Sequence, residues 1–256
     1  MLKKRIIPTL LYKDFGLVKG KQFNSWRRVG SVLPTVKVFN LREVDELIFL
    51  DITATNNKKE PNYDVIKEIS KFCFVPLTIG GGINSLDQVD KLFEIGADKV
   101  SVNTASYKNP KLIYEIANKY GIQCVVASVD VLYENKKWNC YANSGSKNMK
   151  LDPVSWVKTL ESYGAGEILL TSIDRDGTMN GYDHEIISAV SSSIKIPIIA
   201  SGGAGNLDDM SYAISNSGAS ALSASSIFHF TEKTPLEVKK YLSNQGIAIR
   251  KNFFYK

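Results

Sequence analysis

The sequence predicts an α/β protein folded as a closed (β/α)8 barrel (TIM barrel), and three observations lead to this prediction. Eight short apolar segments alternate with amphipathic segments along the 256 residues. Several of these segments are hydrophobic at consecutive positions, as strands covered on both faces of a parallel sheet are. Finally, the two halves of the chain resemble each other, and each contains four of the segments. An open, doubly wound sheet is the alternative architecture.

The eight predicted strands are short runs enriched in valine, isoleucine and leucine. They span residues 5–11, 46–51, 75–79, 98–103, 124–130, 167–172, 197–201 and 219–225. The segments between them are long enough for the helical crossovers that parallel neighbours require. Eight strands with helices between them are the number that closes a (β/α)8 barrel.

Five predicted helices carry recognisable start and stop signals. Three begin with a proline in the first turn, and a glycine follows the end of four. A serine is placed to cap the second helix. The five helices span residues 62–72, 85–95, 109–120, 152–163 and 234–244.

A long-range repeat relates the two halves of the chain. Residues 41–51 resemble 163–172, residues 75–82 resemble 196–203, and residues 96–104 resemble 218–226, all at nearly the same offset. This period is far longer than that of a solenoid repeat. We therefore expect one domain over residues 1–256, with half-barrels at about 1–122 and 123–250.

Composition excludes several classes of protein. A total of 32 Lys and Arg against 26 Asp and Glu gives a net charge of +6, spread without a basic block, so nucleic-acid binding is not favoured. No apolar run is long enough to span a membrane. Three unpaired-looking cysteines suit a reducing cytoplasm, and two distant histidines make a metal site or a Ser-His-Asp triad unexpected. No cofactor is predicted.

Glycine clusters follow two strands at equivalent places in the two halves. Glycines 80–82 end the third predicted strand, and Gly202 and Gly203 follow the seventh. Small polar residues end the next strand in each half, at 103–104 and 225–226. Bare backbone and exposed amides at such places bind phosphate. Two such phosphate sites, one in each half of the barrel, predict an elongated bis-phosphate ligand. Tight turns without a ligand are the alternative interpretation.

Carboxylates stand at or just after the ends of predicted strands, where barrels place catalytic groups. Asp130 ends the fifth strand between apolar residues, a setting that favours acid–base chemistry near neutral pH. Asp51 ends the second strand, and Asp174 and Asp176 follow the sixth. For Asp51, the capping of a loop is an equally good interpretation.

The chain resembles the HisF cyclase subunit of imidazole glycerol phosphate synthase from Met1 to about Arg250. The resemblance is carried by segments 5–8, 51–54, 80–83, 96–101, 164–172, 174–178 and 200–206. It implies a barrel paired with a glutaminase in a heterodimer. Ammonia released by the partner would enter at the bottom, cross the barrel and react at the top with a bis-phosphorylated, formimino-linked aminoimidazole carboxamide ribulotide.

The resemblance also implies the residues of the site. Asp130 matches the second of two acid–base aspartates. The residues matched to substrate and phosphate binding are Lys19, Asp51, Gly81, Gly82, Asn103, Thr104, Thr171, Asp176, Gly177, Ser201, Gly202, Gly203, Ala224 and Ser225.

One departure from the family pattern concerns catalysis. Leu11 stands where the first acid–base aspartate is expected, and Asp14 in the following loop is a poor geometric substitute. Loss of one such group typically lowers the rate by ~10²–10⁴, or roughly 3–5 kcal/mol. Residues 10–19 look more like a HisF-like branch associated with surface polysaccharides, in which ammonia serves to amidinate a sugar. Segments 23–34 and 143–146 also depart from the usual pattern.

Four charged residues stand at strand starts: Arg5, Glu46, Lys99 and Glu167. Two acids and two bases at equivalent heights can close a ring of salt bridges; a solvated set of charges is the alternative. In the family these positions gate ammonia entry, and Asp98 matches a position that meets the glutaminase.

The sequence leaves several functions open. The first is a HisF-like subunit that conducts ammonia for sugar amidination, with a glutaminase and a sugar amidotransferase as partners. The others are a working cyclase of histidine biosynthesis, a non-catalytic scaffold that activates the glutaminase, and a related phosphosugar isomerase, which would not need the four-charge ring.

Overall fold

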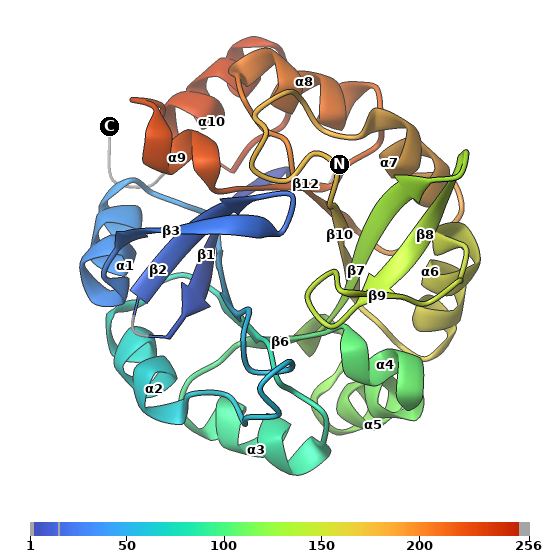
Figure 1. The fold of residues 1–256 in the computed structure, drawn as a ribbon. Coiled ribbons are helices and arrows are strands. Elements are labelled where there is room, and N and C mark those ends of the chain that lie inside the picture. The colour runs from blue at the N-terminus through green and yellow to red at the C-terminus, as the bar shows by residue number, and fades with distance from the viewer. Residues whose placement is uncertain (1–2, 15, 251–256) are drawn as a thin grey trace.

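Eight parallel strands close into a barrel, as predicted (Figure 1). The computed structural model describes residues 3–14 and 16–250. The first two and last six residues of the predicted domain, and Phe15 within segment 10–19, lie outside the described residues. The barrel strands in order are β1 (Arg5–Lys13), β4 (Leu47–Asp51), β5 (Leu77–Gly80), β6 (Lys99–Val102), β7 (Val125–Glu134), β10 (Glu167–Ser172), β11 (Ile198–Ser201) and β12 (Ala221–Ala224). Parallel pairing of β12 with β1 completes the circuit and excludes the open-sheet alternative.

Helices surround the barrel. The five predicted helices are present as α2 (Tyr63–Phe72), α3 (Leu86–Glu94), α5 (Lys111–Tyr120), α6 (Pro153–Ser162) and α10 (Pro235–Asn244). The expected cap of α3 is present, because the Ser85 side chain accepts from the Gln88 N–H. Five further helices and one 3₁₀ turn were not predicted: α1 (Val32–Leu41), α4 (Thr104–Lys108), η1 (Ile122–Cys124), α7 (His184–Ser191), α8 (Leu207–Ser215) and α9 (Ser226–Phe230). No helix in these described ranges is long and apolar enough to cross a membrane.

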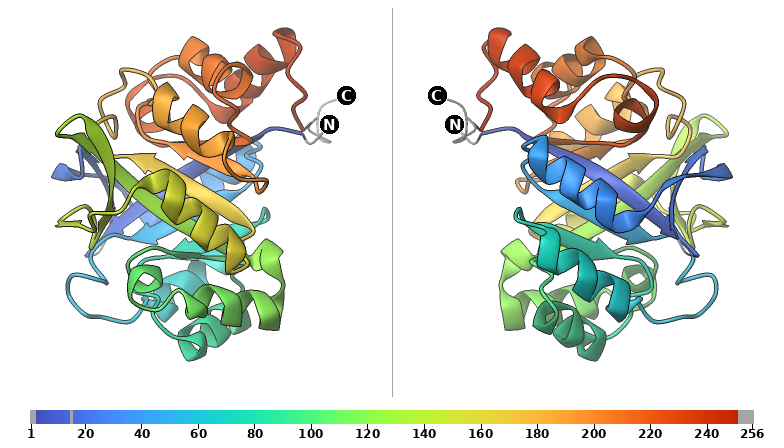
Figure 2. Two further views of the ribbon diagram at one scale, coloured as in Figure 1. Left: turned by 90° about the vertical axis from the view of Figure 1, so that its right-hand side faces the viewer. Right: turned by 90° about the vertical axis from the view of Figure 1, so that its left-hand side faces the viewer.

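Two antiparallel extensions stand over the carboxyl ends of the barrel strands (Figure 2). One is the hairpin of β2 (Gly16–Lys21) and β3 (Asn24–Gly30), which pairs with β1. The other consists of β8 (Lys137–Ala142) and β9 (Lys147–Asn148), which pair onto β7. The prediction that residues 11 and 130 end their strands is therefore wrong. Both strands continue past the rim of the barrel because an antiparallel neighbour takes up their hydrogen bonds.

The barrel interior is stacked in layers. Side chains two residues apart share a face of a strand. The inward face of β1 therefore carries, in order, Arg5, Ile7, Thr9 and Leu11. The middle layer is apolar and buried; it consists of Ile7, Ile48, Val126, Leu169, Ile199 and Ala221. A charged layer therefore lies below this apolar layer, and a polar cavity lies above it.

Candidate functional site

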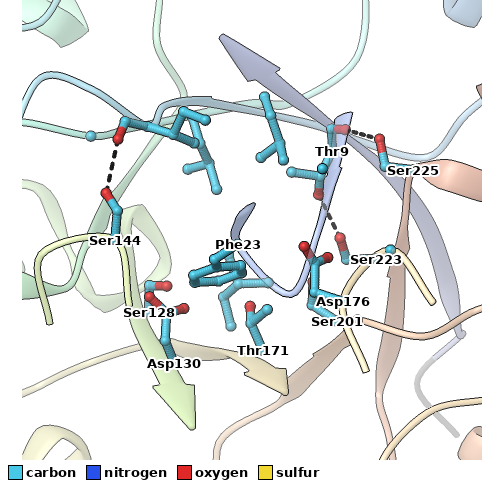
Figure 3. A pocket seen from close by; sticks show the side chains of 18 of the residues that line it. Thr9, Phe23, Ser128, Asp130, Ser144, Thr171, Asp176, Ser201, Ser223 and Ser225 are labelled. Atoms are coloured by element: carbon cyan, nitrogen blue, oxygen red, sulfur yellow. Dashed lines mark hydrogen bonds between the residues drawn. The ribbon is translucent and has the colours of Figure 1, made fainter. Parts of the chain in front are cut away.

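All the residues matched to substrate binding, together with Asp130, line one cavity at the carboxyl ends of the strands (Figure 3). The structure thus brings together residues from segments far apart in the chain. Their individual roles stay predictions. The cavity also includes residues that the sequence analysis did not single out, among them Thr9, Phe23, Trp26, Ser128 and Met179.

Asp130 is buried in the cavity wall on β7, with 8% of its surface exposed. Asn103 Nδ2 donates a hydrogen bond of 2.7 Å to its Oδ2. Burial, followed by the charge of Asp176, raises the pKa of Asp130 to about 7, although the Asn103 hydrogen bond opposes the shift. A carboxyl group that titrates there can both give and take a proton at neutral pH.

Lys19 and Asp176 supply two more groups that titrate near neutrality. Lys19 is 3% exposed on β2, and its Nζ donates to the Thr9 carbonyl at 3.2 Å. Burial lowers the pKa of Lys19 to about 7, against the attraction of Asp176. Burial likewise raises the pKa of Asp176 to about 6, against the attraction of Lys19. The cavity therefore holds three groups able to exchange protons in the physiological range.

The glycine loops have a backbone geometry that excludes other residues. Gly81 has φ +92°, and a Cβ there would lie 2.0 Å from the Asp51 carbonyl oxygen. Gly203, on the opposite side, has φ +108°, and its Cβ would lie 2.1 Å from the Gly181 carbonyl oxygen. Both loops line the cavity. This close backbone packing explains the glycines without a ligand, so tight turns and phosphate binding are compatible interpretations.

Asp51 has a structural task as well as a place in the cavity wall. Its Oδ1 accepts from the Thr53 N–H at 2.9 Å, the Thr53 hydroxyl at 2.8 Å and the Ala54 N–H at 3.0 Å. These bonds hold the start of the loop between β4 and α2. The loop-capping interpretation of Asp51 is therefore confirmed.

At the level of Leu11, the β1 side of the cavity is apolar. Leu11 and Leu50 line it there, whereas Asp14 is exposed and does not belong to the lining residues. The β2–β3 hairpin brings the aromatic side chains of Phe23 and Trp26 to the cavity. The hairpin is fixed at its tip, where the Gln22 N–H donates to the Asp176 carbonyl at 2.8 Å.

The four charged residues at the other end of the barrel form a closed ring. Arg5 lies 2.7 Å from Glu46 and 3.0 Å from Glu167, and Lys99 lies 2.9 Å from each of the same two carboxylates. Their side chains are 9–15% exposed. The predicted ring of salt bridges is therefore present, and the alternative of separately solvated charges is wrong.

At Glu167 and Arg5, hydrogen bonds and charges within the ring shift the pKa further than burial does in the opposite direction. Burial alone would raise the pKa of Glu167, but Arg5 and Lys99 hold it below its ordinary value. Burial alone would lower the pKa of Arg5, but Glu167 and Glu46 raise it. Asp98, beside the ring, is exposed while its Oδ2 accepts from the Leu77 N–H at 2.8 Å.

A closed barrel of eight parallel strands with helices between them, a cavity at one end and a charged ring at the other belongs to the class of (β/α)8 barrels, in which active sites lie at the carboxyl ends of the strands. Residues 5–234 match the family model described as "Histidine biosynthesis protein". The chain is 46% identical over 251 residues to "Imidazole glycerol phosphate synthase subunit HisF" of Hydrogenobaculum sp. (strain Y04AAS1), covering 98% of this chain and 100% of that protein. It is 45% identical over 250 residues to the HisF subunit of Chlorobium limicola, covering 98% and 100%, and 43% identical over 251 residues to that of Endomicrobium trichonymphae, covering 98% and 96%. The chain belongs to the HisF family of histidine biosynthesis proteins.

Proposed function

We propose that this protein is a HisF-like subunit of a synthase of the imidazole glycerol phosphate synthase type, which takes ammonia in at the charged ring and uses it at the cavity. The observation that carries this proposal is the order of layers within one barrel. Along β1, Arg5 belongs to the ring, Ile7 to the apolar layer and Thr9 to the cavity. Between the ring and the cavity that holds Asp130 lies only the apolar layer, which a small neutral molecule would have to cross.

The face around the ring supports the presence of a partner. Leu41, Phe74 and Ile122 are exposed at 82%, 81% and 57%. Leu41 ends α1, and Phe74 and Ile122 lie between a helix and the parallel strand that follows it, so all three belong to the end of the barrel that carries the ring. Other large apolar side chains of the described residues are exposed as well, but these three share the end with the ring and support it as the site of a partner. We propose that a HisH-like glutaminase binds here, with Asp98 at the interface, in a heterodimer.

Leu11 argues for an acceptor other than the usual cyclase substrate. Cyclisation needs two proton-transfer groups on opposite sides of the reacting atoms, and the position on β1 expected to hold one of them carries Leu11, with Leu50 beside it in the cavity wall. We propose that the ammonia amidinates a sugar destined for a surface polysaccharide, with a sugar amidotransferase as a further partner. Asp130 is the remaining acid–base group.

The cyclase reaction of histidine biosynthesis is the second candidate, and one observation favours it. All the residues matched to phosphate and substrate binding line one cavity, and Asp176 and Lys19 titrate near neutrality beside Asp130. A third candidate is a scaffold that activates the glutaminase and performs no chemistry.

The test combines the purified chain with a HisH-like glutaminase and the bis-phosphorylated cyclase substrate, with glutamine or ammonium as the nitrogen source. We expect the chain to bind and stimulate the glutaminase but to turn over the cyclase substrate at least ~10² times more slowly than Leu11→Asp. Turnover equal to that of Leu11→Asp would favour the cyclase. Failure to bind any glutaminase would contradict the proposal as a whole.

Amidination and scaffolding differ in their dependence on Asp130. Once the acceptor is supplied to the complete complex, Asp130→Asn abolishes product formation if the barrel performs chemistry. The same variant leaves product formation unchanged if the barrel is only a scaffold. Glutaminase stimulation serves as the control for folding and binding in both cases.

A further inference from the structure

A second pocket lies beside the cavity, against the loop between β4 and α2. Thr55, Gly82, Ile83 and Thr104 line both the pocket and the cavity. The two spaces therefore share the wall that holds the predicted phosphate site after β5 and β6. The proposed function does not use this pocket.

The loop that forms one side of this pocket has a defined conformation. The Lys59 N–H donates to the Ala54 carbonyl at 2.9 Å, and the Lys58 N–H donates to the Thr55 carbonyl at 3.2 Å. The loop rests directly on Gly82, because a Cβ there would lie 2.9 Å from the Lys59 carbonyl oxygen and 2.8 Å from the Ala54 Cβ. The lysines of this loop are thus held next to the predicted phosphate site.

The pocket has an excess of positive charge. Lys58, Lys59 and Lys108 line it, and Glu60 is the opposing carboxylate. Within residues 3–14 and 16–250, none of the three lysines has a carboxylate within salt-bridge distance. Their charges are consequently available to an anionic ligand.

Gln88 provides a hydrogen-bond donor at the same place. Its side chain lines the pocket although the residue is only 5% exposed. Its Oε1 accepts from the Asn84 N–H at 2.8 Å, which fixes the amide. In the part of the chain that the structure describes, its Nε2 donates to no protein group. The Nε2 atom is not among the buried polar atoms that lack a partner, so it is open to the pocket and can donate to a ligand there.

We propose that this pocket is a second anion subsite, and that the ligand of this protein carries two adjacent anionic groups, such as a diphosphate, along this wall. The inference rests on the proposed function, because the first of these groups is the phosphate at Gly82 and Thr104. The second group accepts from Gln88 Nε2 and pairs with Lys59 and Lys108. Lys58 adds to the positive potential.

Calorimetric titration of the full chain with orthophosphate, pyrophosphate and tripolyphosphate at one ionic strength tests the proposal. We expect one of the two longer anions to bind about tenfold more tightly than orthophosphate. Gln88→Glu keeps the acceptor for the Asn84 N–H but replaces the donor with a negative charge, so it removes this gain. Lys59→Ala and Lys108→Ala each reduce the gain by about fivefold. Lys158→Ala, on the exposed face of α6, is the matched control and leaves it unchanged.

The outcomes separate the subsite from the proposed function. If orthophosphate binds and the longer anions bind no more tightly, the subsite is wrong and the proposed function is not affected. The subsite is also wrong if the tighter binding of the longer anions persists in Gln88→Glu. Absence of orthophosphate binding to the parent chain contradicts the phosphate site itself. A gain that Gln88→Glu abolishes, in a variant that unfolds at the same denaturant concentration as the parent, supports the subsite.

Discussion

Asp130, Asp176 and Lys19 show how one cavity shifts the pKa values of both acids and bases toward neutrality. Burial disfavours the charged form of each group, so the pKa rises for the two carboxyl groups and falls for the amine. The attraction between Lys19 and Asp176 limits both of their shifts. No cationic group lowers the pKa of Asp130 in this way, and the negative charge of Asp176 raises it further.

The shift at Asp130 predicts a pH-dependent effect on stability. Its folded-state pKa of about 7 lies above the unfolded value of ~4. The folded protein therefore binds more protons between these values, and stability decreases as the pH rises through that range. Asp130→Asn should be more stable than the parent at pH 8, by about 1–3 kcal/mol, with the difference lost near pH 4.

Urea unfolding at a series of pH values measures this difference. Asp87→Asn, at a largely exposed position on α3, is the control and should show no comparable pH dependence. A variant at position 130 that is less stable than the parent at pH 8 would contradict the raised pKa.

At the level of single residues, the sequence predicted which side chains share the cavity but not all of their contacts. Strand ends and glycine clusters identify residues at the barrel rim, because parallel strands end at one face. Phe23 and Trp26 gave no such signal, since they reach the cavity from a hairpin that lies above the rim. The Asn103–Asp130 hydrogen bond depends on side-chain rotamers that no sequence pattern encodes.

Among the elements, the β2–β3 hairpin was the least predictable. Its turn contains Gln22 and Phe23 at φ +52° and +57°, instead of the glycine or asparagine that mark such turns. β3 is mostly exposed, so it has no alternation of apolar and polar residues. By contrast, α8 did carry a recognisable signal, because Asn206 and Asp209 form a capping box.

The capping box of α8 predicts a link between helix stability and the second glycine loop. Asp209 Oδ2 accepts from the N–H groups of Gly205 and Asn206 at 3.0 and 3.1 Å, and the Asn206 side chain accepts from the Asp209 N–H at 2.8 Å. Asn206→Ala should lower the free energy of unfolding by about 1 kcal/mol and weaken phosphate binding at this loop. Denaturant unfolding and orthophosphate titration measure the two effects.

Asn216→Ala, at the other end of α8, is the control for this prediction. Asn216 is exposed, and its backbone rather than its side chain forms the C-cap bond. It should change neither quantity. Equal effects of the two substitutions would show that the box does not hold the loop.

For the molecule as a whole, the charged ring joins the two halves of the chain. Glu167 begins β10 in the second half, and it contacts both Arg5 and Lys99 from the first. The alternation of strands and helices predicted this closure, because seven crossovers of one hand between eight strands bring the last strand beside the first. The half-barrel duplication stays a prediction, since it concerns the history of the chain.

The ring predicts a non-additive response to substitution. Lys99→Met leaves Glu46 and Glu167 with Arg5 as their only partner in the ring, so the free energy of unfolding should fall by about 3 kcal/mol. The double variant Lys99→Met with Glu46→Gln should recover part of this loss, because it removes the uncompensated charge. Chemical denaturation of the single and double variants measures the coupling.

Lys119→Met provides the matched control for the ring. Lys119 pairs with Asp90 at the surface, where the two side chains are 46% and 31% exposed. Its loss should cause no measurable change in stability. Strictly additive losses in the Lys99 and Glu46 variants would contradict the idea that the four charges act as one unit.

The sign of the charges around the ring alternates from each residue to the next. Two positive and two negative groups in this order have no net charge, and their dipoles largely cancel, so the field on the axis falls off steeply with distance. An ammonium ion is therefore not concentrated at such an entrance, and it would lose its hydration shell in the apolar layer above. Neutral ammonia avoids most of that cost, so the proposed entrance is expected to discriminate between ammonia and ammonium.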